Sequence, residues 1–106
     1  MLCGFLLAGC SAESARSTAP LTPEQQHGER LFQSACAGCH DPDSTKPRNG
    51  PGLAGVFRKQ YLPSGAPAND ERVRDVIVHG RLYMPPFNGL LDDQQLNDLL
   101  AYLHTL

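Results

Sequence analysis

The run Cys36-Ala37-Gly38-Cys39-His40 constrains this chain more than any other feature, because it gathers two thiols and an imidazole in one short segment. On a helical turn, residues three and four apart lie on one face. Cys36 and Cys39 can therefore reach one edge of a flat cofactor while His40 points toward its centre. This spacing is the attachment signature of a c-type haem.

A redox dithiol and a zinc site also use such a cysteine pair, and the spacing alone leaves both open. A redox dithiol normally follows a strand and opens a helix, whereas the residues before Cys36 have the pattern of a helix. Zinc usually takes four ligands from two spaced pairs. The chain has no second Cys-x-x-Cys, so zinc would need ligands from His27, His79 or His104. These three histidines are otherwise ordinary surface or core residues, and we favour haem.

Two segments on either side of a long loop are predicted to be helices. A capping box at Thr22 begins the first, which leads directly into Cys36. Asn69 or Asp70 caps the second, and Gly80 ends it. Residues 41–68 between them are rich in Pro, Gly, Ser and Asn and show no regular period. A loop of this length is unusual in a small domain, and a haem would give it a surface to pack against.

A third helix is predicted near the end of the chain. It begins at Asp92, which forms a capping box with Gln95. We expect Tyr102 at the margin of its apolar face. That face consists of Leu96, Leu99, Leu100 and Leu103. No segment alternates as a β-strand would, so we predict an all-α domain of three or more helices with long loops around one haem.

The first 21 residues have the composition of a processed leader and a tether. The apolar start of the chain ends in Leu7-Ala8-Gly9-Cys10, which resembles the lipobox of bacterial lipoproteins. We interpret residues 1–9 as a signal-peptide remnant, Cys10 as the lipidated residue, 10–21 as a flexible tether and 22–106 as the domain. An apolar terminus without this role is the alternative. The apolar run is too short to span a bilayer.

The charge of the chain excludes one class of partner. Nine basic and eleven acidic side chains give a net charge of -2 with neutral histidines. No basic stripe is present, so we expect no binding to nucleic acid.

Residues 22–106 resemble a class I c-type cytochrome. In that family a glycine and an aromatic residue of the first helix pack against an apolar and an aromatic residue of the last. Gly28 and Phe32 match the first pair, and Leu99 and Tyr102 match the second. The missing side chain of Gly28 would let the two helices cross closely.

The resemblance also implies a haem site. Met84, in the segment Met-Pro-Pro-Phe, would bind the iron opposite His40, and the carbonyl of Pro51 would accept a hydrogen bond from His40. A lone methionine can otherwise fill a core. The residues implied around the haem are Pro51, Leu53, Arg58 and Tyr61.

An iron with two protein ligands has no position open to a substrate, which predicts electron transfer and not catalysis. Thioether ligation favours ferrous iron and raises the reduction potential. We therefore predict a monomeric monohaem electron carrier in the periplasm, tethered to a membrane by lipid on Cys10 and serving a redox donor and acceptor. The alternative is a haem enzyme subunit or a gas or redox sensor in which Met84 is displaced.

Overall fold

The computed structural model of the chain describes residues 18–106. This part holds three α-helices, one short 3-10 helix and no β-strand, which confirms the all-α prediction. Two antiparallel bridges, Tyr61 with Pro67 and Arg81 with Met84, stand alone. No helix in this part of the chain has the length and apolarity needed to cross a bilayer. Cys10, with the segment assigned as signal remnant and most of the tether, lies outside the described residues.

Helix α1 (Pro23–Ala35) begins and ends where the sequence predicts. The Thr22 hydroxyl accepts a hydrogen bond from the main-chain N–H of Gln25, whose side chain accepts one from the N–H of Thr22. At the other end, the N–H of Cys36 donates to the carbonyl of Phe32 at 2.8 Å. The cofactor-attachment segment therefore starts as α1 stops.

Helix α2 (Asp70–His79) is capped by Asn69, one of the two residues predicted for this role. The Asn69 side chain accepts from the N–H of Arg72 at 2.9 Å. Gly80 ends α2 with a φ of 72°, a left-handed conformation that glycine adopts without steric cost. The chain then turns into the segment that contains Met84.

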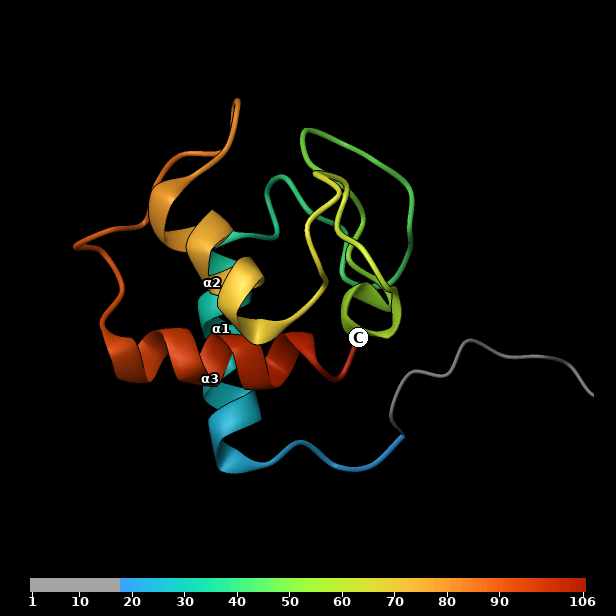
Figure 1. Cartoon of the computed structure of the whole chain (residues 1–106). Helices are drawn as coiled ribbons and strands as arrows, with labels where there is room; N and C mark the ends of the chain where they lie inside the picture. Colours follow the sequence, from blue (N-terminus) through green and yellow to red (C-terminus); the bar gives the residue numbers. More distant parts are fainter. Residues whose placement is uncertain (1–17) are drawn as a thin grey trace, which may run out of the picture.

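Helix α3 (Asp93–Leu103) lies across α1, as Figure 1 shows. A side chain at Gly28 of α1 would overlap the main-chain oxygen of Asp98, so glycine allows this crossing. The rings of Phe32 and Tyr102 pack beside it, 5.5 Å apart and tilted by 57°. The crossing predicted from the sequence is confirmed. Tyr102, however, is 1% exposed and not marginal, because α1 covers the side of α3 that the leucine face leaves open.

The core continues beyond the end of α3. Leu106 is buried, and its main-chain oxygen accepts hydrogen bonds from the N–H of Gly55 and from Nη1 of Arg58, each at 2.9 Å. Both donors belong to the long loop, at the short helix η1 (Val56–Arg58) and the residue before it. These bonds hold part of the 41–68 loop against the last helix. Leu21, the last residue of the expected tether, also packs against the core.

Candidate functional site

A cavity of about 360 Å³ lies where the three helices meet the loops 49–64 and 81–87. Its volume falls within the usual range for ligand and cofactor sites. Side chains from all three helices and from η1 form its apolar wall, among them Phe32, Val56, Val73, Ile77, Leu99 and Leu103. Such a wall would exclude water from a flat, largely apolar group.

The residues predicted to surround a haem fall into two sets. Those that line the cavity are Cys36, Cys39, His40, Pro51, Leu53 and Met84. Arg58 and Tyr61 are absent from its lining. Arg58 contacts the main-chain oxygen of Leu106, and Tyr61 is exposed and forms its bridge with Pro67. A contact of Arg58 or Tyr61 with a haem stays a prediction.

The attachment segment forms a tight turn at the end of α1. The main-chain N–H groups of Cys39 and His40 both donate to the carbonyl of Cys36, at 3.1 and 2.9 Å. Burial raises the pKa of the Cys36 thiol to about 11, and the neighbouring charge of Cys39 adds to the rise. The free thiol of Cys36 is therefore neutral at physiological pH.

The ring of His40 is held by the loop opposite. Its Nδ1 lies 2.8 Å from the main-chain oxygen of Pro51. Because a carbonyl only accepts, Nδ1 must carry the proton, which leaves the lone pair of Nε2 free to bind a metal. Gly50 makes room for the ring, since a Cβ there would fall 2.5 Å from Cε1 of His40. The hydrogen bond that the resemblance implied is present.

Met84 is held beside the cavity by its own short hairpin. Its N–H and carbonyl exchange hydrogen bonds with Arg81, at 2.9 and 3.1 Å. Gly80 lies against the turn, because a Cβ there would come within 2.5 Å of the Met84 carbonyl oxygen. The N–H of Phe87 donates to the carbonyl of Ile77 at 3.0 Å and fixes the far end of this loop to α2. Met84 thus lines the cavity from a loop that α2 supports.

The two alternative uses of the cysteine pair find no support in this part of the chain. Residues 18–106 contain no group of three His, Cys, Asp or Glu side chains placed to hold a metal ion. His27 contacts Asp98 and His104 contacts Asp70, each at 2.5 Å. A redox dithiol would follow a strand, whereas Cys36 follows α1. The chemistry of the cavity, with two thiols, one imidazole and one thioether, fits a c-type haem.

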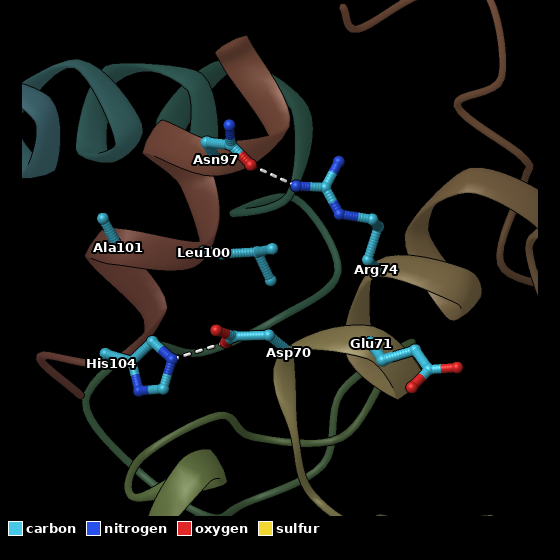
Figure 2. A pocket seen from close by; sticks show the side chains of 7 residues that line it. All are labelled: Asp70, Glu71, Arg74, Asn97, Leu100, Ala101 and His104. Atoms are coloured by element: carbon cyan, nitrogen blue, oxygen red, sulfur yellow. Dashed lines mark hydrogen bonds and ion pairs between the residues drawn. The ribbon is translucent and has the colours of Figure 1, made fainter. Parts of the chain in front are cut away.

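A second hollow, of about 330 Å³, lies between α2 and α3. Figure 2 shows two facing pairs of polar side chains: Arg74 points to Asn97, and His104 points to Asp70. The ring of His104 also stacks on Phe57, with centroids 3.7 Å apart. These groups join elements of the fold, so we assign no ligand to this hollow.

Two residues near His40 have roles that sequence reasoning missed. Gly50 gives the imidazole its space, and Arg48 donates from Nη2 to the carbonyls of Ala37 and His40. The only sequence signal for these roles was the position of Arg48 and Gly50 shortly before Pro51. Neither contact follows from helical periodicity.

Comparison with known proteins identifies the family of the chain. Residues 23–103 match the family described as Cytochrome C oxidase, cbb3-type, subunit III. The chain is 30% identical to cytochrome c-551 of Bacillus subtilis, over 92% of this chain and 82% of that protein. It is 32% identical to cytochrome c of Sesamum indicum, over 72% of this chain and 84% of that protein.

A further relative is much longer than this chain. A nicotinate dehydrogenase component of Pseudomonas putida is 35% identical over 73% of this chain, a match that spans only 7% of that protein. The matches to proteins of similar length, together with the cavity, decide the assignment. The chain belongs to the cytochrome c family as a small class I c-type cytochrome with covalently bound, iron-containing haem c, and it is an electron carrier and not an enzyme.

Proposed function

We propose that His40 and Met84 are the two axial ligands of one haem c, attached through Cys36 and Cys39, and that the chain passes single electrons between extracytoplasmic redox proteins. The observation that carries this proposal is the hydrogen bond from Nδ1 of His40 to Pro51, in a cavity that Met84 also lines. The Pro51 carbonyl accepts a hydrogen bond from the Nδ1–H, so Nε2 is the ring nitrogen able to bind iron.

The haem iron supplies the one-electron chemistry, and the chain supplies its surroundings. His40 keeps a fixed tautomer, because its Nδ1–H is held by Pro51. The soft sulfur of Met84 favours the ferrous state. Among the described residues, no Asp or Glu lines the cavity, and His40 and Arg81 are its basic groups. An apolar wall without carboxylates disfavours extra positive charge on the iron, which also favours the ferrous state.

The location and partners belong to the same proposal. The lipobox-like segment ending at Cys10 supports a lipid anchor on the periplasmic side of a membrane. Several acyl chains on one residue would give stable anchoring. We propose a monomer that meets its donor and acceptor by diffusion along that membrane, since a tether of small polar residues would leave the domain free to turn.

Optical spectroscopy of the purified holoprotein tests the ligation. The expected reduced spectrum has sharp α and β bands, and the expected ferric spectrum has a weak band near the red end that reports sulfur ligation. A denaturing gel stained for haem tests covalent attachment. A high-spin spectrum would contradict ligation by Met84, and a protein band without stain would contradict the haem site itself.

A further inference from the structure

The side chain of Arg48 joins the two ends of the segment that carries the second cysteine. Its Nη2 donates to the carbonyl of Ala37 and to the carbonyl of His40, each at 2.8 Å. Ala37 precedes Cys39 by two residues and His40 follows it directly. One planar guanidinium group therefore bridges the turn that holds Cys39 and His40.

The main chain around Arg48 strengthens this contact. The N–H of Gly50 donates to the carbonyl of Cys39, and the N–H of Arg48 donates to the carbonyl of Gly50, both at 2.9 Å. The carbonyls of Ala37, Cys39 and His40 lie beyond the end of α1, where no further helical turn supplies N–H donors to them. Residues 48–50 supply those donors instead.

We propose that Arg48 is a positioning residue for the haem site, which fixes the orientation of His40 and, through its positive charge, raises the reduction potential of the iron. This inference rests on the proposed haem ligation. Ferric iron carries one more positive charge than ferrous iron, so a nearby fixed cation disfavours the ferric state.

An acidic residue also lies beside the site. Asp41 follows His40 directly, and its carboxylate accepts hydrogen bonds from the N–H of Asp43 and the hydroxyl of Ser44, at 2.8 and 2.9 Å. Removal of Arg48 would leave this negative charge less balanced. The loss of the cation therefore lowers the reduction potential, since the charge of Asp41 is present in both wild type and variant.

The substitution Arg48→Lys separates the electrostatic role from the positioning role. Lysine keeps the charge but lacks the planar group whose one nitrogen reaches both carbonyls. Lys46 offers a matched control, because it lies in the same loop, is exposed, and its side chain is absent from the cavity lining. Lys46→Gln removes one positive charge and leaves the carbonyl contacts of Arg48 in place.

The experiment is a potentiometric titration of the holoprotein, with dithionite as reductant and ferricyanide as oxidant, combined with the electron paramagnetic resonance spectrum of the ferric form. Arg48→Gln should lower the equilibrium constant for one-electron reduction by about three- to tenfold, and should shift the ferric g values. Arg48→Lys should recover the potential but keep the altered g values. Lys46→Gln should change the equilibrium constant by less than about twofold and leave the g values unchanged.

Each part of the inference can be overturned separately. A wild-type potential in Arg48→Gln, or an equal fall in Lys46→Gln, refutes the electrostatic role. Unchanged g values in both Arg48 variants refute the positioning role. If Arg48→Gln does not acquire haem, the g values of Arg48→Lys alone test that role. Absence of covalent haem from the wild type would refute the proposed function, whereas haem-loaded variants with wild-type properties refute this inference only.

Discussion

His27 on α1 contacts Asp98 on α3 through Nδ1 and a carboxylate oxygen 2.5 Å apart, next to the point where the helices cross at Gly28. The other carboxylate oxygen of Asp98 accepts from Nε2 of Gln94 at 2.9 Å. Asp98 is 5% exposed, yet both oxygens have partners. A buried carboxylate thus joins the two helices, and its partners determine how the crossing responds to acid.

The first prediction concerns this response. The hydrogen bond from His27 holds the pKa of the Asp98 carboxyl below its usual value, and Gln94 adds to the effect. A carboxyl whose pKa is lower in the folded state contributes stability above its unfolded pKa of about 3.9, and this stability is lost as pH falls through the folded value. Wild type should therefore unfold at a higher temperature than Asp98→Asn at pH 6, and the difference should shrink below about pH 4.

Thermal unfolding of the two holoproteins across this pH range provides the measurement. Asp75→Asn is the matched control, because Asp75 is about half exposed and lies 3.8 Å from Arg72 in a surface pair. Such pairs contribute little. A gap between wild type and Asp98→Asn that stays constant from pH 6 to pH 3 would contradict the assignment.

The second prediction concerns the crossing itself. Gly28→Ala adds one methyl group that would overlap the main-chain oxygen of Asp98 and approach Cβ of Tyr102. We expect a loss of about 1–3 kcal/mol in the free energy of unfolding, despite the higher helix propensity of alanine. Gly38→Ala is the control, because a Cβ at Gly38 meets nothing within 4 Å. Denaturant unfolding of the holoproteins measures both, and equal stabilities would exclude the close approach.

The third prediction concerns the hairpin before Met84. Leu82 has a φ of 54°, the only positive φ of a non-glycine residue between residues 18 and 106, and its side chain is 85% exposed. A left-handed conformation costs an ordinary residue about 1–2 kcal/mol. Leu82→Gly should therefore raise the free energy of unfolding by about 0.5–1 kcal/mol.

Tyr83→Gly is the control for this turn. Tyr83 is also exposed and lines the cavity as Leu82 does, but it has no positive φ, so glycine there relieves no strain and should lower stability. Unfolding in denaturant compares the two variants. If both glycine substitutions destabilise the protein equally, the backbone at Leu82 is not strained.

The sequence predicted the helix boundaries because their signals are local. Thr22 and Asp92 begin α1 and α3 through contacts with residues three positions later, and Gly80 ends α2 by its own conformation. The cavity residues Cys36 and His40 were also predictable, since motif spacing on one turn decides which side chains share a face.

Contacts between distant segments were less predictable. Tyr102 is buried in the core because α1 covers it. This burial results from the crossing of α1 and α3, which the periodicity along α3 does not reveal. Arg58 bonds to Leu106, which is 48 residues away. Arg48 reaches Ala37 across a loop whose course depends on its packing. Sequence patterns determine the apolar faces and the ends of helices, whereas these contacts depend on how the loops and helices pack against one another.

The fourth prediction concerns the membrane anchor. Lipid on Cys10 would contribute about 0.8 kcal/mol for each buried CH₂ group. Cys10→Ser should therefore release haem-loaded protein into the soluble fraction while its optical spectrum stays that of wild type. Fractionation of cells with haem staining of each fraction measures this. Unchanged partition into membranes would refute the lipid anchor and leave the electron-transfer proposal intact.

The last prediction concerns Met84, the proposed sixth ligand of the iron. Met84→Ala should keep covalent haem through Cys36 and Cys39, because neither thioether bond involves the loop at 81–87. The reduction potential should fall, since axial ligands and their surroundings tune haem potentials over a range of about 0.8 V. Met84→His should also lower it but keep the iron low-spin, because imidazole favours the ferric state more than a thioether does.

Carbon monoxide binding to the reduced proteins tests whether Met84 occupies the sixth position of the iron. Met84→Ala should bind the gas readily, because its sixth position holds at most a weak ligand, and wild type should bind it hardly at all. The hairpin bonds between Arg81 and Met84 run through the main chain and survive the substitution, so a difference in binding reports the lost sulfur. Wild type that binds carbon monoxide as fast as Met84→Ala would show that Met84 is not a firm ligand and would refute the proposed ligation by His40 and Met84.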